Sequence, residues 1–389
     1  MEKQDQSYKN INSLESYIRH QEPETREKAA AWQTAIGLQA VDGLTTSEYL
    51  QQTAVRNIEG DITFDEARQL IDSYYQSADA RKDVNEDQQE ADKASANIAK
   101  LLSEPTFTFS TQGLCEVHRR IFEGVFKHAG TMRDYNITKR EWVLDGDTVL
   151  YGNASELGRT IQYDLEQERS FSYRGLSSEQ VISHLTRFVS DLWQIHPFCE
   201  GNTRATATFT IKYLRSIGFQ VDNSLFANYS WYFRNALVRS NYRNVPKGIE
   251  PDDTFLNRFF ENLLLGKKHE LKNRWMHVRA KDALMTGKVS VETGQVKSKT
   301  GQVDMMPTNK KVAELIKALA EGTLSVKELM ERLELKGRDN FLSNYLNPAI
   351  SEGCVEPLYP NSPRHPRQKY KLTVKGLIYL NNANIINFI

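Results

Sequence analysis

The segment Ile195-His196-Pro197-Phe198-Cys199-Glu200-Gly201-Asn202-Thr203-Arg204 decides how the middle of this chain folds. Pro197 ends the helix that the apolar spacing predicts before it, and Gly201 permits a backbone angle that other residues avoid. The segment is therefore predicted to form a tight loop that leads into the N-terminus of a new helix. The free amide groups and positive dipole end of such a terminus favour an anion such as phosphate.

Three side chains of this loop have chemistry suited to a phosphate ester. His196 has the one side chain whose ordinary pKa suits removal of a proton near neutral pH. Glu200 offers the hard oxygen ligand that Mg²⁺ prefers. Arg204, on the first turn of the new helix, can form a charge-assisted contact with phosphate. A base, a metal ligand, an anion cradle and an arginine thus lie within one short segment.

Helical spacing of apolar residues dominates on both sides of the loop. A helical region is predicted from Glu24 to Ala78, with stops at Gly43 and Gly60 and capping residues at Thr45 and Thr63. Further helices are predicted at Thr111–Phe126, Ala154–Glu168, Ser178–Ile195, Thr203–Ile217, Tyr229–Tyr242 and Thr254–His277. The expected fold class is therefore mainly α.

One segment breaks the helical pattern. Asp145-Gly146 separates two short runs of β-forming residues, 140–144 and 147–151, and Asp-Gly in this position predicts a β-hairpin. A single hairpin in a helical domain is marginal by itself, so it is either fixed by packing or available to pair with another strand. A simple surface excursion is the alternative.

A second domain is predicted near the C-terminus. Residues 287–307 resemble a linker, and short helices are expected from Lys310, after Ser325, and from Asp339 or Asn340. A hairpin between Val355 and Thr373 follows them. Basic residues cluster around its tip: Arg364, His365, Arg367, Lys369 and Lys371. This order predicts a small α+β winged helix-turn-helix that could bind DNA, although the cluster could equally be a solvated loop.

Composition limits the class of protein. Lys and Arg number 50, Asp and Glu number 50, and 39% of the 389 residues are hydrophobic. Neutral overall charge gives no general attraction to nucleic acid or lipid. The three cysteines, at positions 115, 199 and 354, are widely spaced, which argues against a disulfide framework or a thiolate zinc site. No signal peptide or long apolar run is present, so we expect a cytoplasmic protein with no membrane partner.

Residues 196–204 resemble the signature HPFx[DE]GNGRxxR of the Fic family of nucleotidyltransferases, whose members typically move AMP from ATP to a hydroxyl side chain. The resemblance covers roughly residues 100 to 270, including 118–124 and 130–133. It implies a Fic-type helical bundle with a β-hairpin flap. The expected organisation is an N-terminal helical regulatory region (1–100), a Fic catalytic domain (101–278), a linker (279–306) and the winged helix domain (307–389).

The resemblance also implies a role for each site residue. His196 would be the catalytic base and Glu200 the Mg²⁺ ligand. Residues expected to bind ATP or its phosphates are Gly201, Asn202, Thr203, Arg204, Tyr232 and Asn235, although Tyr232 and Asn235 could instead be core residues. The flap residues expected to hold a target protein are Val143, Leu144, Thr148, Val149 and Leu150.

Two positions depart from the family pattern. Thr203 stands in place of the second glycine, and Ala207 in place of the second arginine, which holds the terminal phosphates in the family. Upstream, Glu59 and Gly60 resemble the end of the inhibitory motif [ST]xxxE[GN], with Val55 at its Ser/Thr position. Glu59 is therefore a candidate inhibitory residue, and an ordinary solvated helix end at Gly60 is the alternative.

The sequence therefore predicts a protein adenylyltransferase that transfers AMP from ATP to a Ser, Thr or Tyr hydroxyl of a target protein. Autoinhibition by the N-terminal helix is an added expectation. Two alternatives are a DNA-binding regulator whose Fic body only senses nucleotide, and an enzyme that transfers another nucleotide such as UMP.

Overall fold

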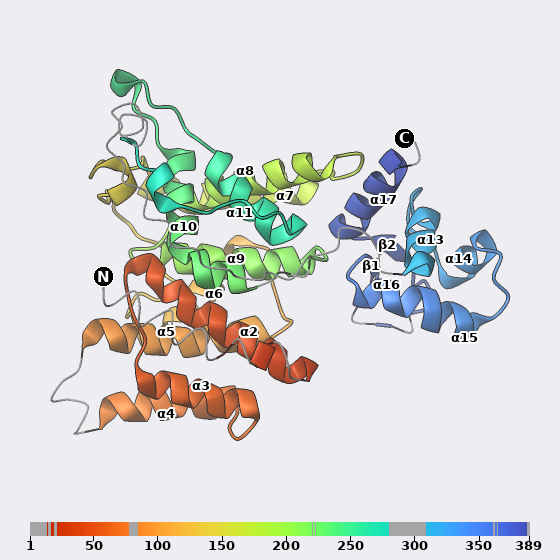
Figure 1. The fold of residues 1–389 in the computed structure, drawn as a ribbon, viewed down its shortest axis with the longest axis horizontal. Helices are drawn as coiled ribbons and strands as arrows, with labels where there is room; N and C mark the ends of the chain where they lie inside the picture. The colour runs from red at the N-terminus through yellow and green to blue at the C-terminus, as the bar shows by residue number, and fades with distance from the viewer. Residues whose placement is uncertain are drawn as a thin grey trace.

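The computed structural model describes residues 14, 17–18, 22–77, 85–219, 221, 223–279, 309–360, 362–363 and 365–386. Nearly all of the linker predicted at 279–306 lies outside them. The described chain is mainly helical, as expected, and its two strands form one small sheet near the C-terminus (Figure 1). No helix in these ranges is long and apolar enough to cross a membrane.

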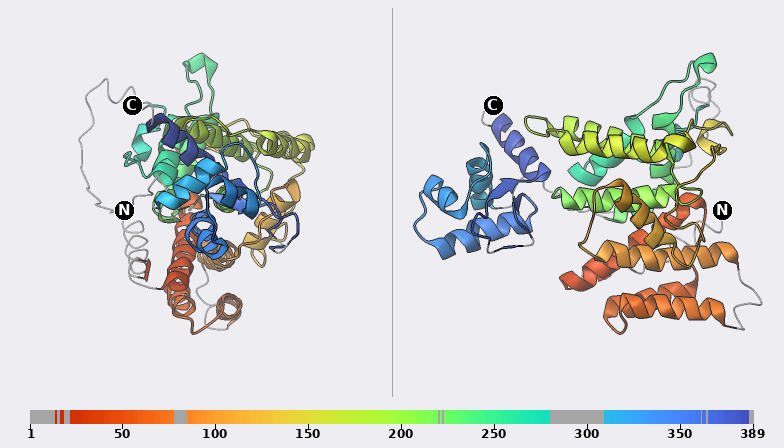
Figure 2. Two further views of the ribbon diagram at one scale, coloured as in Figure 1. Left: turned by 90° about the vertical axis from the view of Figure 1, so that its right-hand side faces the viewer. Right: turned by 180° about the vertical axis from the view of Figure 1, so that it is seen from behind.

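The larger part of the molecule is a helical body. Its helices are α2 (Pro23–Gly37), α3 (Glu48–Glu59), α4 (Phe64–Gln76), α5 (Glu86–Ser103), α6 (Thr111–Phe122), α7 (Leu157–Ser170), α8 (Ser178–Ile195), α9 (Asn202–Ser216), α10 (Asn223–Asn241) and α11 (Thr254–Leu265). The 3₁₀ turn η1 (Leu38–Asp42) follows α2. In both figures α9 lies in the middle of this body, with α7 and α8 on one side and α2 and α5 on the other (Figures 1 and 2).

One hydrophobic core joins the N-terminal helices to the rest of the body. It includes Trp32 of α2, Ile58 of α3, Phe226 of α10 and Phe259 of α11. The close approach of α2 to α10 requires a glycine, because a Cβ at Gly37 would lie 2.4 Å from the backbone of Ala227. The domain border predicted after residue 100 falls within α5. The domain borders remain predictions.

Several helix boundaries follow the sequence signals, and others do not. Thr63 and Ser325 each form the expected N-cap, here as a capping box with a glutamate three residues later. Ser47, and not Thr45, caps α3, because its side chain accepts a hydrogen bond from the amide of Leu50. Helix α11 ends at Leu265, before a left-handed Gly266, and not at His277. No separate helix was predicted at α5, which lies mostly within the region 1–100 that was expected to be helical.

The C-terminal domain has its own core and the predicted order of elements. Its elements are α13 (Lys310–Ala318), α14 (Val326–Arg332), α15 (Arg338–Phe341), the π-turn η7 (Leu342–Leu346), α16 (Asn347–Ser351), β1 (Val355–Pro357), β2 (Tyr370–Leu372) and α17 (Val374–Ile386). The strands are antiparallel, with Val355 opposite Leu372. Helix α17 was not predicted.

The C-terminal domain packs on the end of α9 through a close contact between two backbones (Figure 2). A Cβ at Gly218 would lie 2.2 Å from the carbonyl oxygen of Gly353. Arg174, after α7, donates a hydrogen bond to the carbonyl of Ala320 at 2.9 Å. Ile378 of α17 also lies in the core of the larger body. The two parts therefore form one continuous packed structure.

Residues 139–151, called the flap segment below, form a turn without paired strands, which corrects the expected β-hairpin. Asp145 and Gly146 both have left-handed backbones, as the Asp-Gly pair predicts. Residues 142–144 form a 3₁₀ turn. Backbone hydrogen bonds cross the loop from the amide of Glu141 to the carbonyl of Asp147 at 2.9 Å and from the amide of Gly146 to the carbonyl of Glu141 at 3.0 Å. Val143, Leu144 and Val149 are buried in the core. Packing against the body therefore replaces strand pairing.

Candidate active site

The predicted loop between α8 and α9 is present, and its backbone is unusual at both ends. His196 follows α8 with a φ of 50°, and Gly201 precedes α9 with a φ of 73°. A Cβ at Gly201 would lie 2.2 Å from the ring of Phe122. Only glycine fits this position, because both the backbone angle and the neighbouring ring exclude a side chain.

Arg133 holds the loop from behind. Its guanidinium donates hydrogen bonds of 2.6–3.3 Å to the backbone carbonyls of four residues: Tyr135, Gly152, Ile195 and His196. Its backbone amide also donates to the carbonyl of Pro197 at 2.9 Å. The sequence had placed Arg133 in a family motif without a role. The structure shows that it fixes the backbone that carries His196.

Asn202 and Thr203 complete the loop from the start of α9. The Asn202 amide accepts from the backbone amide of Phe198 at 2.9 Å and donates to the carbonyl of the same residue at 2.7 Å. The Thr203 hydroxyl accepts from the indole of Trp193 at 3.0 Å. Both side chains are thus used within the protein. The amides of the first turn of α9 receive no side-chain cap, so the backbone is what this helix offers to an anion.

His196 is buried, with 3% of its surface exposed, and packs against Tyr151 at a ring distance of 4.3 Å. Burial holds the pKa of its imidazole well below the ordinary value, and the positive charge of Lys139 adds to this effect. The ring is therefore neutral at physiological pH and able to accept a proton. Neither ring nitrogen has a hydrogen-bond partner among the described residues. Such an unsatisfied buried group is costly and is typical of a functional position.

His118 of α6 supports the loop next to Glu200. Its Nδ1 accepts the backbone N–H of Gly130 at 2.8 Å, so Nε2 carries the proton and donates to the carbonyl of Glu200 at 3.0 Å. The ring also stacks on Phe198 at 3.7 Å. Burial lowers the pKa of His118 to about 4. The structure therefore requires the neutral imidazole with its proton on Nε2.

Glu200 points outward, with 57% of its side chain exposed, and its Oε2 lies 3.0 Å from Nζ of Lys139. The described residues contain no cluster of three or more metal-ligating side chains. A single accessible carboxylate suits Mg²⁺, which usually takes one or two carboxylates and completes its shell with water and phosphate oxygens. The residues present therefore fit the ion that the resemblance implies.

The side chain of Arg204 is turned into the protein, although its place in the motif implied that it would contact phosphate. It is almost fully buried, with Nε 2.8 Å from Asp42 and Nη2 2.6 Å from Glu90. Its Nη1 donates to Gln39 at 3.0 Å. We call Asp42 and Glu90 the carboxylate clamp. Ala207 is also fully buried, so neither arginine position of the family motif offers a free cation here.

Glu59, the candidate inhibitory residue, is exposed at the end of α3 and accepts a hydrogen bond from the hydroxyl of Tyr17 at 2.5 Å. Glu59 does not pair with Arg204, whose acidic partners among the described residues are Asp42 and Glu90 of the carboxylate clamp.

Tyr232 and Asn235 are buried. The Tyr232 hydroxyl donates a hydrogen bond to the carbonyl of Phe255, and the Asn235 side chain donates to that of Asn273. These contacts match the alternative that both are core residues.

The flap segment is tied to α10 beside His196. Arg234 of α10 forms a bidentate ion pair with Glu141, at 2.9 and 3.0 Å. Tyr151, which packs on His196, also donates to Glu141 at 3.3 Å. No short motif announces this pair, because its members are 93 residues apart. It fixes one end of the flap segment against the 196–204 loop.

A cavity of about 1030 Å³ lies against the flap segment. Its lining includes Thr148, Val149 and Leu150, together with Gln194 of α8 and Asn241 of α10. The Leu150 side chain is 85% exposed. Among the predicted target-binding residues, Thr148 and Leu150 are thus accessible, whereas Val143, Leu144 and Val149 are buried.

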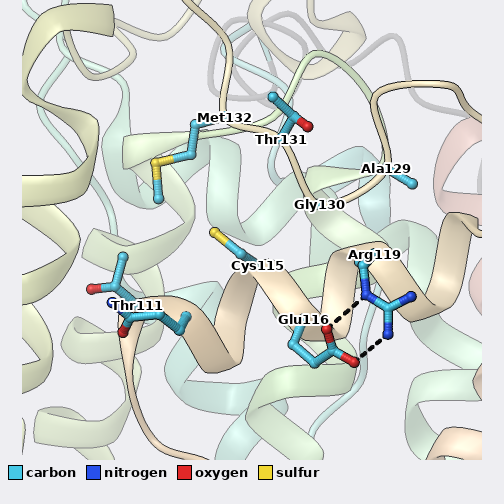
Figure 3. A pocket seen from close by; sticks show the side chains of 9 residues that line it. Thr111, Cys115, Glu116, Arg119, Ala129, Gly130, Thr131 and Met132 are labelled. Atoms are coloured by element: carbon cyan, nitrogen blue, oxygen red, sulfur yellow. Dashed lines mark hydrogen bonds and ion pairs between the residues drawn. The ribbon is translucent and has the colours of Figure 1, made fainter.

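A second cavity, of about 500 Å³, lies between α6 and the segment before Arg133 (Figure 3). Figure 3 shows the bidentate pair between Arg119 and Glu116 on one wall, with the sulfur of Cys115 nearby. Burial raises the pKa of the Cys115 thiol, which disfavours a reactive thiolate. No residue of the 196–204 loop lines this cavity, so we do not include it in the candidate active site.

Comparison with family models matches two segments of the chain. Residues 108–214 match the Fic/DOC family, and residues 310–373 match the domain described as filamentation induced by cAMP protein Fic-like, C-terminal domain. Among curated proteins, a protein adenylyltransferase of Bartonella henselae is 26% identical over 182 residues, which are 43% of this chain and 31% of that protein. A probable protein adenylyltransferase Fic of Salmonella typhimurium is 28% identical over 98 residues, which are 25% of this chain and 45% of that protein. The chain thus spans less than half the length of each.

Two solved structures are also similar. A Fic family protein from Desulfovibrio desulfuricans aligns over 95% of both chains, with 18% identity and a TM-score of 0.35. The N-terminal Fic domain of a Bartonella effector protein aligns over 47% of this chain and 88% of its own, with 18% identity and a TM-score of 0.37.

Proposed function

This chain carries a Fic/DOC family domain at residues 108–214 and a Fic-like C-terminal domain at residues 310–373, and from that premise we propose that it is a protein adenylyltransferase. It transfers AMP from ATP to a hydroxyl side chain of a target protein. The observation that carries the proposal is His196, a buried neutral imidazole with both nitrogens unpartnered, held beside the uncapped start of α9.

In the proposed reaction the target hydroxyl attacks the α-phosphorus of ATP, and pyrophosphate leaves. His196 removes the hydroxyl proton as the new P–O bond forms. The amides at the start of α9 stabilise negative charge on the transferring group, since they are already oriented and bear no cap. Glu200 would hold Mg²⁺, which supplies positive charge to the phosphate oxygens. Arg133 keeps the base in place through the backbone.

The test is transfer of label from ATP that carries it on the α-phosphate. The full chain is incubated with Mg²⁺ and a cell lysate, and the proteins are separated and examined for label. We expect labelled protein with ATP, and a fall of about 10²–10⁴-fold for His196→Ala, the usual effect of losing a general base. Parallel reactions with labelled UTP examine the alternative donor.

The outcomes also separate the enzyme from the regulator hypothesis. A regulator that only senses nucleotide would bind ATP and leave every protein unlabelled. If the His196→Ala variant labels protein as fast as wild type, His196 is not the general base, because loss of that base should slow the transfer.

We further propose that the accessible part of the flap segment, Thr148 and Leu150, positions the target as an extended strand. Leu150→Pro removes a backbone donor that such a strand would need. We expect protein labelling to fall by about tenfold or more, as for loss of one or two hydrogen bonds, with ATP affinity unchanged. Leu150→Ala is the matched control, because it removes the side chain and keeps the donor. Equal labelling by wild type and the proline variant would show that the flap is only structural.

A further inference from the structure

Phosphoryl transfer needs cations that contact the phosphates, and among the described residues the three arginines around the loop, Arg133, Arg204 and Arg234, are all engaged by other groups. The guanidinium of Arg133 is occupied by backbone carbonyls. That of Arg204 is held by the carboxylate clamp and Gln39. The guanidinium of Arg234 forms a bidentate ion pair with Glu141, using both of its terminal nitrogens. Moving any of these would leave a buried charge without its partner, which is strongly unfavourable.

Lys139 differs from these three arginines. Its ammonium forms one ion pair among the described residues, with the Glu200 carboxylate at 3.0 Å, and that carboxylate is itself more than half exposed. Its own side chain is 26% exposed. Its charge also acts on the neighbouring His196 ring and lowers the pKa of that group, after the larger effect of burial. Lys139 therefore lies beside both the proposed base and the proposed metal ligand.

The backbone of Lys139 is held in place, whereas its ammonium group is attached only to an exposed carboxylate. Its amide donates to the Thr148 hydroxyl at 3.1 Å, across the base of the flap segment. A lysine carries a compact charge with three donors on a flexible stem. The ammonium can therefore move from Glu200 to an anion in the cradle without any change in the fold.

We propose that Lys139 is a catalytic residue that contacts the nucleotide phosphates and supplies the charge that Ala207 does not. The inference rests on the proposed function, because it assumes that the cradle binds ATP. It adds a residue outside the 196–204 loop. It also explains how a site with a buried Arg204 can still bind a polyanion.

The experiment measures ATP affinity and does not depend on transfer. Titration calorimetry on the full chain at saturating Mg²⁺ compares wild type with Lys139→Met, Lys139→Gln and Lys139→Arg. We expect the dissociation constant to rise about tenfold for the neutral variants and to stay within about threefold for arginine, as for loss or retention of one charge-assisted contact. Lys327→Met is the control, because that side chain is 87% exposed on α14.

Salt dependence supplies a second measurement that a purely structural role would not alter. Between about 50 and 300 mM salt, the wild-type affinity should fall more steeply than that of Lys139→Met, since one screened contact is missing in the variant. Thermal unfolding of the same samples checks that all variants are folded. Lys139→Gln serves where Lys139→Met is unstable, since it keeps a polar side chain.

Each outcome decides between the two proposals. Equal ATP affinity in wild type and both neutral variants overturns the role of Lys139 and leaves the proposed function standing. Weaker ATP binding in the neutral variants, in a chain that labels no protein, supports the role of Lys139 and refutes the transfer reaction. A wild-type chain that binds no nucleotide refutes both.

Discussion

Acidification should destabilise the fold through His118. The folded-state pKa of this buried imidazole is lowered from 6.5 to about 4, so the unfolded chain binds the proton more readily. Stability from this group is therefore full above pH 6.5 and is lost as the pH falls toward 4. A shift of this size is worth about 2 kcal/mol between pH 7 and pH 4.5. Burial is the main cause of this lowered pKa. In addition, a protonated Nδ1 would face the N–H of Gly130, whose hydrogen bond it now accepts.

The assay is chemical denaturation of wild type and His118→Gln at several pH values between about 7 and 4.5. Other groups also titrate in this range, so the quantity of interest is the difference between the two proteins. Glutamine can still donate and accept, but it does not titrate. We expect the stability advantage of wild type to shrink by about 2 kcal/mol on acidification.

Imidazole NMR signals provide an independent check of the same reasoning. The His118 ring should remain neutral, with the proton on Nε2, until the pH falls below about 5. A ring that titrates near 6.5 would refute the argument, and so would a difference in stability that does not change with pH.

Four other changes test separate parts of the site. Glu200→Ala should abolish the dependence of transfer on Mg²⁺ and lower the rate, which a Mg²⁺ titration of labelling checks; an unchanged midpoint would exclude Glu200 as the ligand. Gly201→Ala should lower the free energy of unfolding by about 2 kcal/mol or more and abolish transfer, measured by denaturation and labelling, because the methyl group would overlap a ring and strain the backbone. Asp42→Asn combined with Glu90→Gln should destabilise the fold by about 3 kcal/mol, since Arg204 would stay buried without its charges. Glu59→Gly should raise transfer a few-fold at equal ATP if the inhibitory motif operates, and equal rates would make Glu59 an ordinary helix end.

The local course of the catalytic loop could be predicted because it depends on residues that act on their own backbone. Pro197 and Gly201 set where one helix ends and the next begins, and the start of α9 follows from them. The Asp-Gly turn of the flap segment was predictable for the same reason. Whether strands would pair beside it was not, since this depended on the burial of Val143 and Val149 against distant helices.

The surroundings of Arg204 show what a sequence pattern cannot supply. The motif identifies the arginine and its helix, but its partners Gln39 and Glu90 lie 165 and 114 residues away. Only the packing of the N-terminal helices against the body brings them together. For Tyr232 and Asn235 the sequence left a core role and a nucleotide-binding role open for the same reason, because helical spacing alone does not say which face of α10 meets the core and which meets a ligand.

The contact between Gly218 and Gly353 joins the C-terminal domain to one end of α9, and the other end of this helix carries the 196–204 loop. Helix α9 has 15 residues, or about 22 Å, and it begins at the catalytic loop and ends two residues before Gly218. Because no side chain lies between these two backbones, a displacement of the C-terminal domain at this point would move the end of α9 directly. We therefore expect a ligand of that domain that shifts this contact to change the affinity of the proposed nucleotide site at the other end of α9. By thermodynamic reciprocity, nucleotide must change the affinity of that ligand by the same factor.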